Sequence, residues 1–119
     1  MNENKRRIGG FYEQLAGEYL TEQGLTIVEY NYRCRSGEVD LIARDGDYLV
    51  FVEVKYRSSE DAGGPLAAVG HTKQRIISRV AKFYLLSHYN TMDIACRFDV
   101  VGFHDSEVQW VKNAFDYCS

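Results

Sequence analysis

Residues 37–56 of the chain, GEVDLIARDGDYLVFVEVKY, predict the centre of its fold. Two runs that predict strands, 38–43 and 48–56, flank Asp45-Gly46, a dipeptide typical of hairpin turns. The second run is apolar at successive positions at its start, as in strands that are covered on both faces. The segment therefore predicts an antiparallel hairpin whose second strand lies in the middle of a sheet.

The flanking sequence adds two helices and three strands. Phe11, Leu15 and Tyr19 recur at helical spacing before Gly24, a residue typical of helix ends. Thr72 is a candidate N-cap for the second helix. The expected elements are a helix over 10–24, strands over 26–34, 38–43 and 48–56, a loop over 57–70, a helix over 72–89, and strands over 94–103 and 107–111, with a possible helical turn up to residue 117.

This order, α-β-β-β-α-β-β, predicts an α/β fold with a central mixed five-stranded sheet flanked by helices. The first three strands suit an antiparallel meander. The second helix can cross over and place the fourth strand parallel to the third. At 119 residues, 45% of them hydrophobic, the chain is long enough for a single domain over 1–119 with one core, and residues 1–8 are expected to form a flexible tail.

Composition excludes several classes of protein. No apolar run is long enough for a membrane helix, and the basic start is not followed by the apolar segment of a signal peptide. Three widely spaced cysteines without zinc-ligand spacing favour reduced thiols in a cytoplasmic protein. The net charge of −3 argues against a strongly basic DNA-binding module. Twelve of the 14 Lys and Arg residues lie within residues 1–82, so nucleic acid is expected to meet that part of the chain.

Asp40, Glu53 and Lys55 are the candidate chemical site. Alternation along a strand puts Glu53 and Lys55 on one face. A two-residue turn at Asp45-Gly46 places Asp40 opposite Phe51, and a turn two residues longer places it opposite Glu53. In both registers the three charged side chains lie within reach of one another.

Two adjacent carboxylates in a very apolar strand are costly unless they bind something. A divalent cation relieves their repulsion, and hard oxygen ligands suit Mg²⁺. Such an ion activates water and stabilises the charge that develops in phosphodiester hydrolysis, while a nearby lysine orients the water or neutralises charge. The alternative is a cross-strand cluster of salt bridges without chemistry.

The same residues carry a resemblance. Gly37-Glu38-Val39-Asp40-Leu41-Ile42, followed by Phe51-Val52-Glu53-Val54-Lys55, is similar to the uncharacterised YraN-like family of bacterial proteins. That family resembles the restriction-endonuclease-like superfamily, with its D…ExK signature, and in particular the archaeal Holliday-junction resolvases. The resemblance extends from Gly10 to about Phe115.

The resemblance implies a Mg²⁺ or Mn²⁺ site with Asp40, Glu53 and the Val54 carbonyl as ligands and Lys55 as the residue that positions water. It adds an acidic residue from the first helix, which Glu13 matches. Glu13 then serves as a water-mediated or second-metal ligand, or else is an ordinary first-turn acid favoured by the helix dipole.

Several further residues are candidates with open alternatives. Gln74 either points at the metal or a phosphate, as a catalytic residue, or makes a helix-start contact. Glu38 either supports Asp40 or is solvated. Strand tyrosines stack on bases or pack across strands; these are Tyr30, Tyr32, Tyr48 and Tyr56. Five basic residues are candidate phosphate contacts or solvated charges, namely Arg33, Arg35, Arg57, Lys73 and Arg75.

Two functions fit this reading. The first is a Mg²⁺-dependent endonuclease that hydrolyses DNA, including branched DNA. The second is a non-catalytic module on a nuclease-like fold that binds nucleic acid or protein. The sequence also leaves a homodimer open, as well as the choice of DNA or RNA and the role of loop 57–70.

Overall fold

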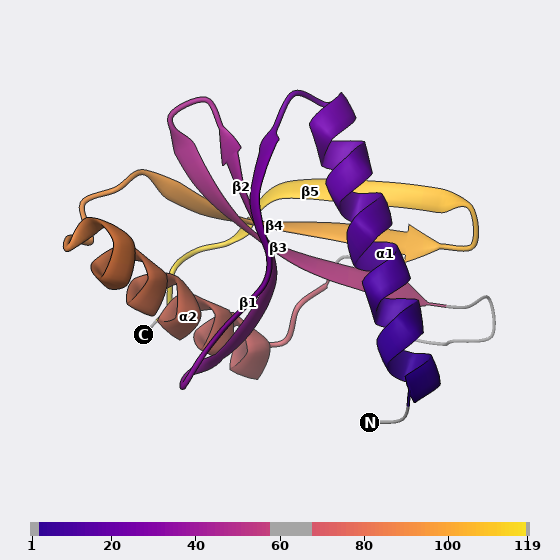
Figure 1. The fold of residues 1–119 in the computed structure, drawn as a ribbon, viewed down its shortest axis with the longest axis horizontal. Coiled ribbons are helices and arrows are strands. Elements are labelled where there is room, and N and C mark those ends of the chain that lie inside the picture. Colours follow the sequence, from indigo (N-terminus) through magenta and orange to yellow (C-terminus); the bar gives the residue numbers. More distant parts are fainter. Residues whose placement is uncertain (1–2, 58–67, 119) are drawn as a thin grey trace.

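The structure is a computed structural model, which describes residues 3–57 and 68–118. Its elements follow the expected order (Figure 1). They are α1 (Glu3–Glu22), β1 (Thr26–Cys34), β2 (Gly37–Asp45), β3 (Tyr48–Arg57), α2 (His71–Tyr89), β4 (Cys96–His104) and β5 (Glu107–Phe115). The α/β class and the order of elements are confirmed.

The strands form one five-stranded sheet in the order β1-β2-β3-β4-β5. β2 is antiparallel to both β1 and β3, α2 connects β3 to the parallel β4, and β5 returns antiparallel to β4. β3 is therefore the central strand, as its apolar sequence predicts. Residues 49–52 of that strand are fully buried.

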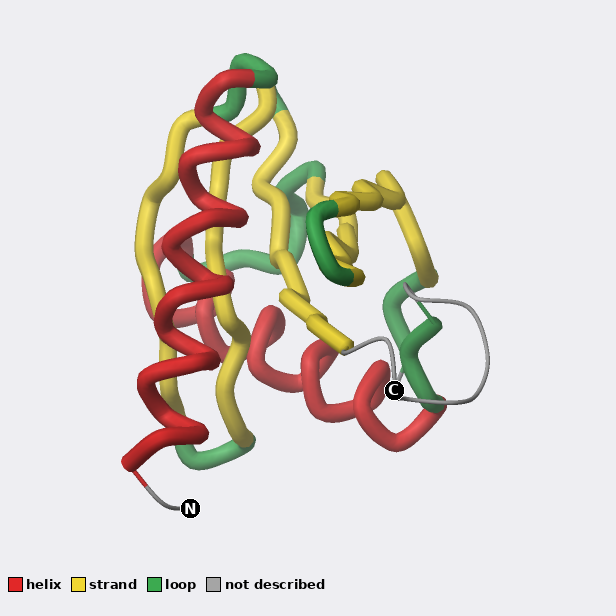
Figure 2. Tube along the Cα trace, turned by 90° about the vertical axis from the view of Figure 1, so that its right-hand side faces the viewer, coloured by secondary structure: helices red, strands yellow, loops and turns green. Residues whose placement is uncertain are grey.

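The two helices cover opposite faces of the sheet. Ala16 and Leu20 of α1 pack against Val50 and Val52, whereas Ile77 of α2 belongs to a second cluster with Phe51 and Phe98. In Figure 2, α1 runs along the neighbouring strands and α2 lies at an angle to it. Each helix thus buries its own face of β3, and the two faces of that strand meet different helices.

Several boundaries differ from the sequence prediction. α1 begins at Glu3, so residues 3–8 are helical and do not form the expected tail, consistent with the helix propensities of Glu, Lys and Arg. The N-cap of α2 is Gly70, and no side chain caps the helix. β5 continues to Phe115 where a helical turn was predicted, because the Phe115 ring stacks on Phe98 with centroids 5.0 Å apart.

The hairpin between β2 and β3 has Asp45 opposite Tyr48, so Gly46 and Asp47 form its turn. Gly46 has a φ of 60°, which glycine adopts without strain. Leu41 lies opposite Val52, and the same register continued by one residue places Asp40 opposite Glu53. This is the second of the two registers considered from the sequence.

Alternation breaks in the first two strands at Asn31 and Asp40. Val39 packs on the α2 side, but Leu41, two residues later, packs on the α1 side. In β1, Tyr30 reaches Gly17 of α1, whereas the Tyr32 ring meets Tyr84 of α2.

Asn31 has a φ of 54°, and the pairing of β1 with β2 skips Asn31 and Asp40. The left-handed conformation of Asn31 allows side chains on either side of it to face opposite sides of the sheet, and the same change of face occurs in β2 at Asp40, the position opposite Asn31. Asp40 therefore lies where the regular pairing of β1 with β2 is interrupted, and its side chain belongs to neither hydrophobic cluster.

Candidate metal and phosphodiester site

Asp40 lies between the strands. Its Oδ2 atom accepts a hydrogen bond of 2.8 Å from the amide of Val54 in β3. The ladder between β2 and β3 ends at Leu41 and Val52, so the carboxylate occupies the position of a backbone acceptor. The sheet thus opens beside Val54, and Asp40 lines the opening.

Glu53 projects from β3 toward α2. Its side chain is 11% exposed, and its Oε1 atom is buried without a hydrogen-bond partner among residues 3–57 and 68–118. Burial, the charge of Asp40 and a hydrogen bond with Asp40 raise the pKa of Glu53 to about 8, although Lys73 lowers it. A buried polar atom without a partner is unusual and costly, so this oxygen is available for a ligand.

Glu13 approaches Asp40 from the other face, where α1 lies. Burial and the charge of Asp40 raise the pKa of Glu13 to about 7, while a hydrogen bond from Asn31 lowers it. Glu38 is a further, weaker cause of the raised pKa of Glu13, and its own carboxylate pairs with Arg33. The acids therefore form a row through the sheet, from Glu13 past Asp40 to Glu53.

Two lysines lie on the α2 side of this row. The Lys73 Nζ atom, in the first turn of α2, is 3.5 Å from Glu53 Oε2. The Lys55 Nζ atom donates a hydrogen bond to the carbonyl of Ala68, in the segment that leads into α2. Lys73, a candidate phosphate contact from the sequence, thus neighbours the carboxylate directly, and Lys55 is held close to the same segment.

The donor atoms suit Mg²⁺, which typically takes one or two carboxylates and keeps several waters. Asp40 and Glu53 provide two carboxylates, and Glu53 Oε1 is unpartnered. The N–H and C=O of one strand residue point to the same edge, so the Val54 carbonyl opens toward Asp40 as its amide does. Within residues 3–57 and 68–118, no three His, Cys, Asp or Glu side chains are grouped tightly enough for a metal ion. This agrees with Glu13 lying on the α1 side, apart from Glu53.

The other candidates are spread around this site. Gln74 donates its side-chain amide to the Val69 carbonyl over 2.8 Å, so the nitrogen makes a helix-start contact. Arg35 and Arg75 are exposed, and Arg57 is half-buried at the end of β3. Residues 58–67 of the predicted loop lie outside the described part of the chain.

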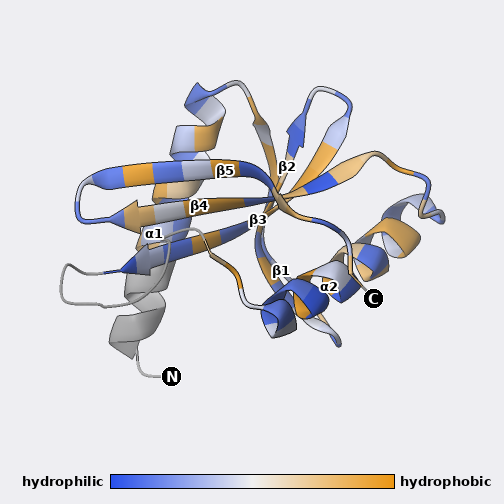
Figure 3. Ribbon diagram, turned by 180° about the vertical axis from the view of Figure 1, so that it is seen from behind, coloured by the Kyte–Doolittle hydropathy of each residue, from blue (hydrophilic) through white to orange (hydrophobic). Residues whose placement is uncertain are grey.

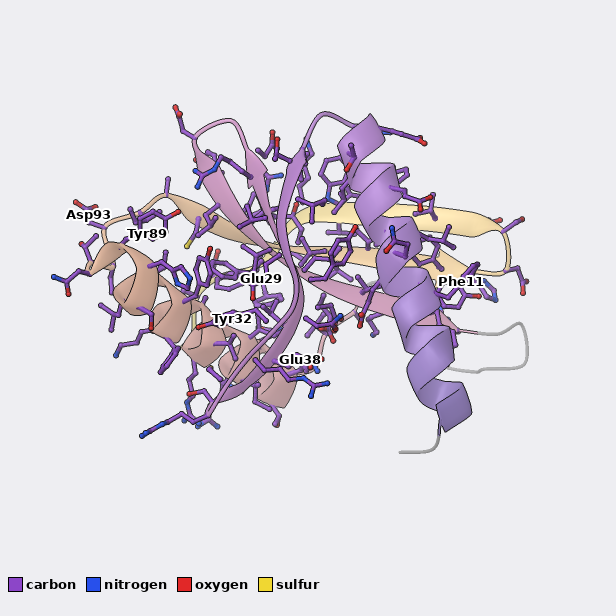
Figure 4. The ribbon with its side chains drawn as sticks, viewed as in Figure 1. Phe11, Glu29, Tyr32, Glu38, Tyr89 and Asp93 are labelled. Carbon is purple, nitrogen blue, oxygen red and sulfur yellow. The ribbon has the colours of Figure 1, made fainter. Side chains whose placement is uncertain are left out.

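The tyrosines mostly pack. Tyr56 stacks on Tyr12 of α1 at 4.6 Å, Tyr30 lies under α1 against Gly17, and Arg97 lies over the ring of Tyr48. Tyr32 fills the space between β1 and α2, while Glu38 lies near the far end of the β1–β2 hairpin (Figure 4). These contacts explain the rings by packing and leave base stacking as a prediction.

Sequence reasoning missed Asn31 and the cluster around Asp99. Asn31 contacts Glu13 and allows the change of face that frees Asp40. An asparagine inside a strand pattern was the available signal, because asparagine is depleted in strands and tolerates positive φ. Asp99 is fully buried and accepts hydrogen bonds from Arg97, the Trp110 indole and the Asn113 amide. No pattern in the sequence brings those four residues together.

Fold and site define an α/β protein with a row of partly buried carboxylates at a break in its sheet. The chain matches the model of "Uncharacterised protein family UPF0102" over residues 12–103. It is 49% identical over 113 residues to a UPF0102 protein of Lachnoclostridium phytofermentans, which covers 95% of this chain and 96% of that protein. A UPF0102 protein of Nitrosomonas europaea is 47% identical over 111 residues, with 91% and 92% covered.

The chain therefore belongs to family UPF0102, the YraN-like family indicated by its motifs. Among the described residues, neither helix has the length and apolar character needed to cross a membrane. The three cysteines are free thiols.

Proposed function

We propose that the protein is a Mg²⁺- or Mn²⁺-dependent endonuclease that hydrolyses DNA phosphodiester bonds, including those of branched DNA. The observation that supports this most directly is Glu53, a buried carboxylate with an unpartnered oxygen beside Asp40. Buried acids with strongly raised pKa values occur preferentially at functional sites. A cytoplasmic setting suits both this substrate and the free thiols.

In this proposal Asp40, Glu53 and the Val54 carbonyl would hold the metal ion, with Glu13 acting through Asp40 or a water. A bound Mg²⁺ would acidify water and offset the charge that develops at phosphorus. Glu53, with its pKa of about 8, must lose a proton to become a ligand, so metal binding would release that proton. Lys55 would leave the Ala68 carbonyl to orient the attacking water.

Cleavage of linear, flap and four-way DNA with Mg²⁺ or Mn²⁺ tests the proposal. Asp40→Asn and Glu53→Gln should each lower the cleavage rate by about 10³-fold, because each removes a metal ligand. Glu107→Gln, an exposed carboxylate at the start of β5, is the matched control and should cleave normally. Cleavage that survives both site substitutions would rule out this assignment.

The alternative function is a non-catalytic binding module. It is favoured by the contacts of both lysines, because Lys73 already lies beside Glu53 and Lys55 is held by the Ala68 carbonyl. Calorimetric titration with Mn²⁺ separates the two functions. Absence of metal binding up to millimolar concentration, together with absence of cleavage, would favour the module.

A further inference from the structure

α2 concentrates positive charge that the rest of the chain lacks. Its 19 residues include four Lys and Arg and no Asp or Glu. The whole chain has 14 basic and 17 acidic residues, which leaves 10 basic and 17 acidic outside α2, a net charge of −7 there. A helix of this charge on an acidic protein creates a local positive field that attracts anions.

Three of these basic residues form one outward stripe. Arg75, Arg79 and Lys82 follow one another at four- and three-residue spacing, and all three are exposed. The buried residues of α2, such as Ile77 and Ala81, lie on the opposite side. Figure 3 shows hydrophilic and hydrophobic segments alternating along this helix. No ion pair of the described residues neutralises the stripe.

The stripe borders a shallow hollow of about 210 Å³. Its lining is mixed, with the Ser36 hydroxyl and two cations beside two apolar side chains; the residues are Ser36, Arg79, Lys82, Phe83 and Leu86. Phe83 is 40% exposed and Leu86 is 43% exposed. The β1–β2 turn closes one side of the hollow, since a Cβ at Gly37 would come within 2.7 Å of Ile76 of α2.

We propose that this α2 face, comprising Arg75, Arg79, Lys82 and Phe83, together with Ser36 of the adjoining β1–β2 turn, binds the phosphodiester backbone of the DNA strand that leads to the Asp40–Glu53 site. The inference rests on the proposed function and extends it to the path of the substrate. The stripe from Arg75 to Lys82 rises about 10 Å along the helix, the length of about three nucleotides in a DNA strand.

The position of the stripe favours nucleic acid over an acidic polypeptide. Lys73, in the first turn of α2, lies 3.5 Å from Glu53, so the helix that carries the stripe begins beside the carboxylates. Cations binding phosphates supply sequence-independent affinity, which a structure-directed nuclease needs. Phe83 offers an apolar surface for a sugar or an unpaired base.

The test is fluorescence anisotropy of labelled flap and four-way DNA across a salt series, without divalent metal, so that cleavage plays no part. Arg75→Gln, Arg79→Gln and Lys82→Gln should each reduce the slope of log affinity against log salt by about 0.9, and R79Q/K82Q by about 1.8. Lys112→Gln, which removes one exposed cation from β5, is matched in charge and should leave the slope unchanged.

An unchanged slope in R79Q/K82Q would overturn the inference, as would a wild-type protein that binds neither DNA. Displacement of DNA by poly-glutamate as efficiently as by unlabelled DNA would also overturn it, and would indicate an acidic polypeptide partner. The two proposals fail separately. Cleavage that persists in Asp40→Asn rejects the metal site alone, whereas normal binding by the α2 variants rejects this surface alone.

Discussion

Glu53 and Asp99 are buried carboxylates in neighbouring strands of one sheet, yet their surroundings differ. Asp99 is 0% exposed, and both of its oxygens accept hydrogen bonds, from Arg97, from Trp110 at 3.0 Å and from the Asn113 amide at 2.9 Å. Within the described part of the chain, Glu53 has one oxygen without a hydrogen-bond partner and a lysine at 3.5 Å from the other. The first carboxylate is fully bonded within the protein, and the second keeps a position open.

An asparagine with a left-handed backbone conformation lies beside each of the two carboxylate clusters. Asn31 and Asn113 have φ values of 54° and 53°, and each lies beside an aspartate where strand pairing is interrupted. At Asn113 the interruption lets the amide of that residue bond Asp99. At Asn31 it leaves Asp40 facing a gap with two other acids. At the Asp99 break a cation neutralises the buried acid, whereas at the Asp40 break like charges meet, and this repulsion is what the proposed metal ion would relieve.

The largest expected effect is a loss of stability when the Asp99 cluster loses its cation. Arg97→Met should lower the free energy of unfolding by about 3–5 kcal/mol, because it leaves Asp99 buried without its cation. Urea denaturation measures the loss, and Arg44→Met is the control, since Arg44 is exposed and bonds only Tyr89 among the hydrogen bonds found for its side chain in the described residues. A loss below 1 kcal/mol for R97M would mean that the Asp99 cluster is not structural.

Glu53→Gln should raise the free energy of unfolding, whereas Arg97→Met lowers it. The folded-state pKa of Glu53, about 8, is above the ordinary value of 4.5, so protonation stabilises the fold and this stability is lost as pH rises from about 4.5 through about 8. The glutamine side chain cannot ionise. At pH 8 the free energy of unfolding of the variant should therefore exceed that of the metal-free wild type by on the order of 3 kcal/mol, with little difference at pH 4.5. Thermal unfolding with Glu107→Gln as control measures this, and a destabilised variant at pH 8 would contradict it.

A smaller effect concerns Lys73. Its ammonium repels a divalent ion at Glu53, so Lys73→Met should raise Mn²⁺ affinity about fivefold at pH 9, where Glu53 is ionised. Lys82→Met, on the outer face of α2, serves as the control in the same calorimetric titration. Weaker Mn²⁺ binding by K73M would instead mean that Lys73 holds Glu53 in its metal-binding position.

The last comparison concerns the two asparagines with positive φ. Asn31→Ala and Asn113→Ala should each cost about 1–2 kcal/mol, because alanine resists positive φ. Asn31→Gly and Asn113→Gly retain the backbone, but only the former loses the hydrogen bond that lowers the pKa of Glu13. The pH profile of cleavage should therefore move upward in N31G alone, and equal profiles for the two glycine variants would show that Asn31 does not act on the acids.

Much of the fold was predictable because local patterns and tertiary packing agree. The apolar run of β3 predicted a strand covered on both faces, and Asp45-Gly46 located the hairpin to within one residue. The predicted start of α1 was wrong because residues 3–8 have enough helix propensity to extend the helix. The predicted end of β5 was wrong because Phe115 stacks on Phe98 and continues the strand.

The sequence predicted that Asp40 and Glu53 lie close together, but it did not predict how the backbone brings them together. Strict alternation put Asp40 and Glu53 on one face, whereas the structure brings them together through a gap at the change of face beside Asn31. The position of Lys73 was also not readable, because it depends on how α2 docks across the sheet. Lys73 and Glu53 are 20 residues apart in different elements, so no local sequence pattern indicates that they pair.

By itself, the sequence determined the α/β order, the central strand and the two strand carboxylates, Asp40 and Glu53, that make up the candidate site. Those features follow from side-chain periodicity and from chemistry carried within single strands. Only the tertiary structure decided which buried acid is satisfied and which is open. That difference depends on partners from other segments of the chain. Arg97, Trp110 and Asn113 bond Asp99, whereas Glu53 meets Asp40 and Lys73.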